Sequence, residues 1–258
     1  MSDTFNILVI GDSHCGALKR GWDRMAHAHP EIRMTFFASR GKSLSSLYFD
    51  GEGITVKHER VKTALKQLHG YDRVDPSAFD LAVCVGMLNP IVLFVKMQRH
   101  HKLASHDGPA EQKVSEHAFR AAWKDRLGGS LLGHVLRVLR QGGIDRGYVT
   151  LMPMRSEDFL IRSGDVPDFM RAIIANGEAP ALRALLRECM SAALPEGFGY
   201  VPPPESVLVS DIFTKSRYSR ASASLLDGAD LHEDDDFGHM NEAYGEAYLG
   251  HLLQRMRA

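Results

Sequence analysis

The stretch FNILVIGDSHCGAL, residues 5–18, decides the fold, because it places a strand directly before a turn and a helix. Its apolar run Ile7–Ile10 is short and uninterrupted, a pattern typical of a strand buried on both faces. Gly11 ends the run, and the segment Cys15–His27 carries apolar residues on one helical face. The turn between them therefore lies at a helix N-terminus, where backbone N–H groups favour negative charge.

Ser13 lies in this turn, and the sequence leaves two interpretations of it. Serine is a favoured N-cap residue, whose side-chain oxygen accepts a backbone N–H at the start of a helix. A nucleophilic hydroxyl needs the same position, because the oxyanion that forms beside it is stabilised by such N–H groups. Taken alone, the stretch favours the N-cap interpretation.

A second polar stretch lies near the other end of the chain. Residues 234–244 read DDDFGHMNEAY and contain Asp236 three residues before His239. A serine hydroxyl attacks only when a base accepts its proton, and the base needs a carboxylate that fixes its tautomer. One short turn can supply both groups. Together the two stretches favour the catalytic interpretation of Ser13.

The strand with its Gly-Asp-Ser turn and the C-terminal Asp-x-x-His resemble the SGNH (GDSL-type) hydrolase family. The resemblance implies that Ser13 is the nucleophile, His239 the general base and Asp236 the acid that orients the base. It also implies a flavodoxin-like three-layer α/β/α sandwich. These roles come from the family together with the chemistry of a catalytic triad.

The same resemblance implies an oxyanion hole formed by the backbone N–H of Ser13, the backbone N–H of Gly41 and the side chain of Asn89. Gly41 can equally be a turn glycine with a positive φ. The family pattern is Gly-x-Asn, but here Asn89 follows Gly86 one residue later than expected. Either Asn89 still reaches the hole, or Met87 occupies the position and the third donor is missing. We expect Asn89 to be the donor.

Strands and helices alternate along the whole chain. This order predicts one domain, residues 1–258, with a central and mostly parallel sheet between two helical layers. The further strands are expected at Ile32–Ala38, Leu81–Gly86, Gly147–Met152 and Ser206–Ile212. The further helices are expected within 51–69, at Val114–Leu139 with a break at Gly128-Gly129, and at Val166–Ala175, Ala181–Ala193 and Asn241–Met256.

Three polar segments have no clear helix or strand pattern. Gln98–Lys113 contains three histidines and is predicted to be a solvated loop, with a flap over the site as one form of it, rather than a metal site. Phe213–Leu231 is predicted to cross the active-site face as an irregular segment. In it Arg217–Arg220 either contacts substrate or, as we expect, is solvated. The run His232–Asp236 could bind a cation, but a solvated turn is the expected structure.

Composition excludes several classes of protein. The 258 residues are 44% hydrophobic and 24% charged with a net charge of −1, so neither a nucleic-acid partner nor a membrane partner is expected. The three cysteines are scattered, which argues against disulfides and zinc. No dinucleotide or P-loop motif is present, and we expect neither a cofactor nor a metal. The start of the chain shows no signal peptide, so a cytoplasmic protein is expected.

The predicted function is a serine ester hydrolase that works through an acyl-Ser13 intermediate. The substrate is expected to be a small-molecule or carbohydrate ester, and within this class a short-chain or acetyl ester on a sugar is expected. This guess rests on the Gly-Asp-Ser-His form of the turn, which looks like family members linked to polysaccharide modification. Two alternatives stay open: an O-acyltransferase to a sugar hydroxyl, and a non-catalytic carbohydrate-binding protein of the same fold. Acyl length and oligomeric state are not predicted.

Overall fold

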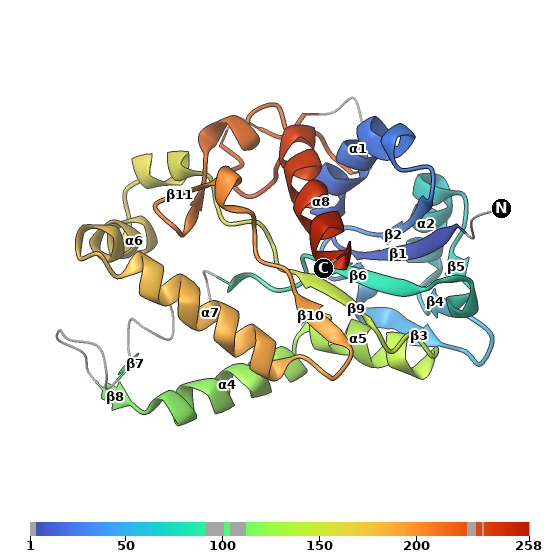
Figure 1. Ribbon diagram of the computed structural model, residues 1–258, viewed down its shortest axis with the longest axis horizontal. Helices are drawn as coiled ribbons and strands as arrows, with labels where there is room; N and C mark the ends of the chain where they lie inside the picture. The colour runs from blue at the N-terminus through green and yellow to red at the C-terminus, as the bar shows by residue number, and fades with distance from the viewer. Residues whose placement is uncertain (1–3, 91–100, 104–111, 226–230, 234, 258) are drawn as a thin grey trace.

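A five-stranded sheet forms the centre of the protein, and all its pairs are parallel (Figure 1). The computed structural model describes residues 4–257 except 91–100, 104–111, 226–230 and 234. The strand order is β10-β9-β6-β1-β2. Their bounds are β1 Phe5–Gly11, β2 Ile32–Ala38, β6 Leu81–Val85, β9 Gly147–Thr150 and β10 Phe198–Tyr200.

The central strand β1 is buried on both faces, as its unbroken apolar run predicts. Residues Ile7–Ile10 are at most 1% exposed. The strand pairs in parallel register with β2, where Ile7 lies opposite Met34, and with β6, where Ile7 lies opposite Leu81. Parallel strands need helical cover on both sides, so every position of such a strand favours an apolar residue.

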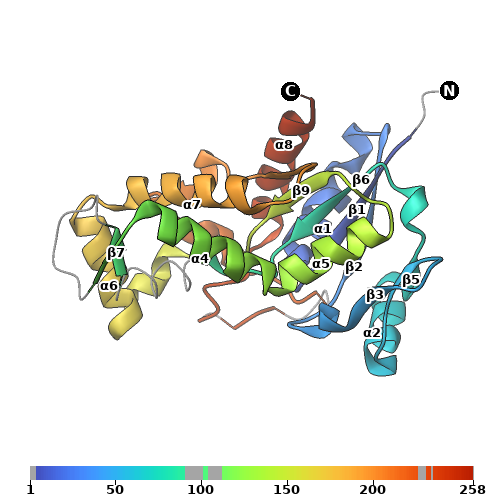
Figure 2. The same cartoon turned by 90° about the horizontal axis from the view of Figure 1, so that it is seen from below.

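Helices cover both faces of this sheet. α1 (Cys15–Met25) and α8 (Glu242–Arg257) lie together on one face, and α5 (Leu131–Gln141) lies on the other (Figures 1 and 2). The predicted fold class, a three-layer α/β/α sandwich with a central parallel sheet, is therefore confirmed.

Two glycines bring α1 and α8 into backbone contact. A Cβ atom on Gly21 would lie 2.5 Å from the backbone N of Glu246, and one on Gly245 would lie 2.0 Å from the backbone O of Ala17. No larger residue fits at either position without moving a helix. The crossing joins the first turn of α8 to the segment of α1 from Ala17 to Gly21, so it also brings together the turns that precede the two helices.

The remaining elements surround this core. The helices are α2 (Glu59–His69), α4 (Glu116–Gly128), α6 (Asp165–Ala175) and α7 (Ala179–Ala193). Three short sheets are β3-β4-β5 (Leu47–Phe49, Ile54–Val56, Arg73–Val74), β7-β8 (His101–Leu103, Gln112–Val114) and β11-β12 (Leu208–Val209, Phe213–Thr214). Single turns of 3₁₀ helix are η1 to η6, at Ala26–Ala28, Ser43–Ser46, Pro76–Ala78, Glu157–Ile161, Glu205–Val207 and Ser216–Tyr218. Among the described residues, no helix combines the length and apolarity needed to cross a membrane.

One predicted strand is wrong. The segment Ser206–Ile212 does not join the central sheet; it lies in η5 and in the hairpin β11-β12. The edge position is taken instead by β10, whose pairing is extended by a hydrogen bond from Val201 N to Val149 O. The prolines Pro202–Pro204 follow directly. They have no N–H to donate, so they end the strand after three residues and leave too little pattern to predict it.

Other expectations meet a mixed outcome. The division of Val114–Leu139 is confirmed, because α4 ends at Gly128 and α5 begins at Leu131. Asn241, where the last helix is expected to begin, caps α8, since its Oδ1 accepts a hydrogen bond from Tyr244 N. Most of Gln98–Lys113, the expected loop or flap, lies outside the described residues. Its described part is the backbone of β7 and the start of β8.

Candidate active site

A cleft of about 760 Å³ opens at the carboxyl ends of the parallel strands. Open α/β sheets bind their ligands at this edge. Four strands of the sheet are each followed, within a few residues of their carboxyl ends, by a residue that lines the cleft: His14 after β1, Arg40 after β2, Asn89 after β6 and Arg155 after β9. The loop before α8 contributes His232 and His239.

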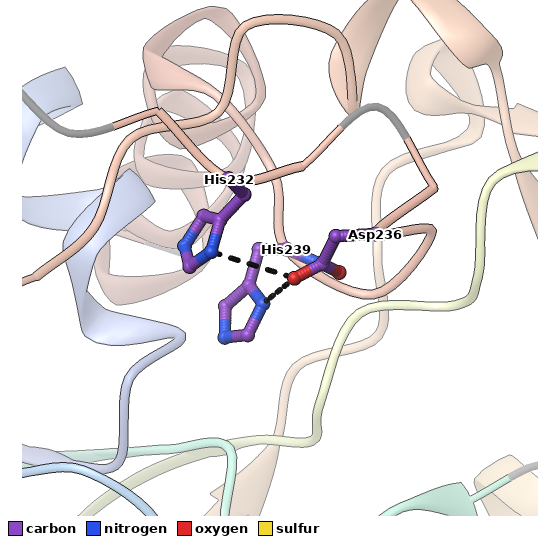
Figure 3. Close-up of side chains that lie close together, drawn as sticks. All are labelled: His232, Asp236 and His239. Atoms are coloured by element: carbon purple, nitrogen blue, oxygen red, sulfur yellow. Dashed lines mark hydrogen bonds and ion pairs between the residues drawn. The ribbon is translucent and has the colours of Figure 1, made fainter.

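The three residues predicted to form the triad lie together: Asp236 and His239 line the cleft, and Ser13, which is not among the lining residues, contacts His239. Ser13 Oγ lies 2.9 Å from His239 Nε2, although the two residues are 226 positions apart. His239 Nδ1 lies 2.6 Å from Asp236 Oδ2 (Figure 3). The other oxygen of Asp236 accepts the backbone N–H groups of Gly238 at 2.8 Å and of His239 at 3.0 Å. The carboxylate therefore fixes both the backbone and the ring of the histidine.

The N-cap interpretation of Ser13 is wrong. α1 begins at Cys15, and its N-cap is His14, whose side chain makes no capping hydrogen bond. The Ser13 hydroxyl is directed to His239 instead of to the helix. The residue thus holds the position next to a helix N-terminus without being used to stabilise that helix.

Asp236 is held in its charged form. Burial raises the pKa of this carboxyl, but the hydrogen bonds from the His239 ring and from the backbone of Gly238 and His239 outweigh burial and hold the pKa well below its usual range. A charged Asp236 accepts the Nδ1–H of the ring. This tautomer leaves Nε2 as the acceptor for the proton of Ser13 Oγ.

Two further imidazole rings stack on His239. The ring of His14 lies 4.7 Å away between centroids and that of His232 lies 4.1 Å away. Burial lowers the pKa of His14 to about 4, with Asp12 opposing the shift and His239 adding to it. Burial also lowers the pKa of His232. Both flanking rings are therefore neutral at neutral pH, so they do not place a second positive charge beside the base.

His232, Asp236 and His239 are close enough together to raise the question of a metal ion, since their ligand atoms all lie within 4.8 Å of one another (Figure 3). A metal bound by imidazole lies close to the plane of the ring. Here the His232 and His239 rings are stacked with their planes only 10° apart, so no single ion lies in both planes. As they stand, these residues suit a hydrogen-bonded triad better than a metal site.

Asp12 is a site residue for which the sequence analysis gave no role. It is 3% exposed, and its Oδ2 accepts the backbone N–H of Met87 at 2.7 Å while its Oδ1 accepts that of His14 at 3.1 Å. It therefore ties the turn after β1 to the turn after β6. The Gly-Asp-Ser motif contains this aspartate, but its hydrogen-bond partner Met87 lies 75 positions away in the chain. The motif alone therefore does not indicate the contact.

Gly86→Ala is expected to destabilise the protein, because Gly86 lies against this carboxylate. Its φ is +74°, and a Cβ atom would lie 2.1 Å from Asp12 Oδ1. A left-handed non-glycine residue alone costs about 1–3 kcal/mol, and the clash adds to this cost. Urea unfolding should show a loss of at least this size. The control Gly250→Ala, in α8 where a Cβ meets nothing, should be neutral or stabilising; equal effects at both positions would contradict the role of Asp12.

The side-chain and backbone donors predicted for the oxyanion hole differ in where they lie relative to the cleft. Asn89 lines the cleft and is partly buried. The side chain of Met87, the residue that would occupy the position if the third donor were missing, is buried, and its N–H is bonded to Asp12. Gly41 is exposed in a turn with φ +55° and is not among the described residues that line the cleft, whereas Arg40 beside it is. The structure thus brings Asn89 to the site but leaves the assignment of Gly41 a prediction.

No family model matches the chain, and no curated protein matches it. Among solved structures, the chain is similar to the periplasmic domain of a lipopolysaccharide acetyltransferase from Salmonella ser. Paratyphi A. The similarity covers 100% of this chain and 85% of that chain, with a TM-score of 0.40 and 8% sequence identity. At this level, membership of the SGNH family is not confirmed and stays a prediction.

Proposed function

We propose that the protein is an acyl-transfer enzyme of the SGNH type that cleaves an ester through an acyl-Ser13 intermediate. One observation carries the proposal: the continuous chain of hydrogen bonds from Ser13 Oγ through both nitrogens of His239 to Asp236. A histidine with only a structural role in the core needs no more than one buried hydrogen-bond acceptor. A histidine that links a hydroxyl to a charged carboxylate, at the open edge of a parallel sheet, has the geometry of a general base.

The reaction follows from this geometry. Ser13 Oγ attacks the carbonyl carbon of the ester while its proton passes to His239 Nε2, and Asp236 stabilises the imidazolium. The tetrahedral intermediate collapses when His239 returns the proton to the departing alcohol oxygen, which leaves the acyl group on Ser13. A second hydroxyl, from water or from a sugar, then attacks the acyl group with the same base, and Ser13 is released.

The acceptor in the second step distinguishes two versions of the function. With water the enzyme is an ester hydrolase, the main prediction from the sequence. With a sugar hydroxyl it is an O-acyltransferase. The non-catalytic alternative, a carbohydrate-binding protein of the same fold, gives no reason for a charged Asp236 to hold the tautomer of His239. Acetyl or other short acyl groups on a carbohydrate stay the proposed substrate class.

A serine-directed fluorophosphonate tests the proposal directly. We expect one adduct, located on Ser13 by mass spectrometry of a proteolytic digest, and no adduct in His239→Ala. Labelled protein should no longer release nitrophenol from 4-nitrophenyl acetate. Adding a sugar alcohol to the unlabelled enzyme separates the two versions, because only a transferase forms the acetylated sugar. Absence of any adduct on Ser13 would reject both.

Asn89→Ala is expected to lower kcat by about 10²–10³-fold with little change in KM. The reason is that an oxyanion donor acts on the charge that develops in the transition state more than on the bound ester. Steady-state kinetics on a chromogenic acetyl ester measure the split. An unchanged kcat would mean that the hole is formed without the Asn89 side chain.

A further inference from the structure

Arg155 occupies a fixed place beside the base. It follows β9, lines the cleft and is partly buried. Its carbonyl accepts a hydrogen bond from Thr214 N at 2.8 Å, and the next N–H, that of Ser156, donates to Phe237 O at 2.9 Å. Phe237 lies between Asp236 and His239 in the chain. The backbone that carries the arginine is therefore bonded directly to the backbone that carries the base.

The guanidinium of Arg155 has an aromatic contact but no carboxylate partner among the described residues. Its central carbon lies 4.3 Å from the centre of the Phe159 ring. The other two arginines of the cleft are engaged: Arg162 pairs with Asp235 at 2.5 Å, and Arg40 donates to Ser224 Oγ at 2.5 Å. Stacking on a ring holds a guanidinium plane in place and leaves its N–H fork available.

The surroundings of Arg155 favour an added negative charge. Burial lowers the pKa of its guanidinium, and the nearby charge of Arg162 lowers it further, against a smaller opposite effect of Asp236. The group stays charged at neutral pH, because an arginine pKa lies far above that range. Two cations thus repel each other beside a partly desolvated cleft. An anion between them and the base would reduce that repulsion.

The carboxylates of the cleft do not supply this anion. Asp235 is paired with Arg162, and Asp236 is bonded to His239. Glu233 also lines the cleft, but it is an exposed residue, so water screens its charge. The available space is also much larger than a short acyl group needs, and most of it is left for the alcohol part of the ester.

We propose that Arg155 binds an oxyanion, a carboxylate or a phosphate, on the alcohol part of the substrate, and that it thereby selects anionic esters over neutral ones. This proposal rests on the proposed function and goes further by naming the charge of its substrate. Arginine fits both groups because its planar fork donates two parallel hydrogen bonds to either.

The test compares three acetyl esters: phenyl acetate, 4-acetoxybenzoate and 4-acetoxyphenyl phosphate. For each anionic ester, the ratio of its kcat/KM to that of the neutral ester should fall roughly 10–100-fold in Arg155→Gln, the range expected for a charged hydrogen-bonded pair. Arg155→Lys should recover part of the ratio. The control Arg73→Gln, an arginine of β5 that pairs with Asp50 and is not among the residues that line the cleft, should change it less than about threefold. The anion with the larger effect identifies carboxylate or phosphate.

A binding readout separates this proposal from the proposed function. 4-Hydroxybenzoate and 4-hydroxyphenyl phosphate are titrated calorimetrically into Ser13→Ala, with and without Arg155→Gln, after circular dichroism confirms that both variants are folded. At least one anion should bind, and the second substitution should weaken it roughly tenfold or more. If no ester is turned over but this loss is seen, only the proposed function fails. If the selectivity ratio and the anion affinity are unchanged by Arg155→Gln, or if neither anion binds, the role of Arg155 is rejected.

Discussion

Ser13→Ala is expected to lower the turnover of a short-chain ester by at least about 10³-fold while the protein stays folded. The hydroxyl is the group that forms the covalent bond to the acyl carbon, and alanine removes it without adding volume. Its Oγ makes a single described hydrogen bond, to His239 Nε2, so the loss to stability should be small. Initial rates on 4-nitrophenyl acetate and a thermal melt measure the two effects.

A matched serine variant provides the control. Ser45 lies exposed in η2, and Ser45→Ala should leave the rate unchanged. The nearby thiol cannot replace the nucleophile, because Cys15 is fully buried and burial raises its pKa well above the usual range. Equal rates for wild type and Ser13→Ala would therefore remove the acyl-serine mechanism altogether.

Asp236→Asn and His239→Ala are expected to have effects of similar or greater size, on the order of 10⁴-fold in kcat for the aspartate. An asparagine amide can donate to Nδ1 and would then favour the tautomer that carries the proton on Nε2, which cannot accept from Ser13. Asp235→Asn is the control, since Asp235 is exposed and paired with Arg162 outside the triad. Asp234→Asn should also be harmless, although Asp234 lies outside the described residues. A costly Asp235→Asn with an active Asp236→Asn would refute the assignment.

The pH profile of kcat/KM gives a second readout of the same residues. The base must be neutral to accept a proton, so the rate should rise with pH along one acid limb. His14 and His232 do not supply that limb near neutrality, because burial lowers the pKa of both. The limb should persist in His232→Gln and disappear, with most of the activity, in His239→Ala. The pH dependence of stability has a different cause from that of the rate. Because the pKa of Asp236 is lower in the folded protein than in the unfolded chain, this group stabilises the folded state above about pH 4, and the contribution is lost at lower pH.

Features carried by one long continuous segment were predictable, whereas contacts between distant segments were not, apart from that of Ser13 with His239, which the family resemblance implied. The runs of β1 and β2 and the face of α8 are long enough to show their period, and the Asp-x-x-His turn contains both of its partners. Strand β10 has three residues before a run of prolines, so its pattern is lost. The role of Asp12 depends on a contact with Met87, and the placing of Arg155 depends on backbone bonds to Thr214 and Phe237. These partners lie in distant segments, which no local pattern records.

The backbone contact between Gly21 and Gly245 has a consequence for the order of folding. Contacts between residues so far apart in the chain form slowly, because a long loop must close before they stabilise anything. Ser13 lies directly before α1 and His239 lies shortly before α8, so the two residues cannot meet until α1 and α8 have docked. During refolding, helical signal should therefore return before the reactive serine does, and a population of chains with complete secondary structure should still resist the fluorophosphonate.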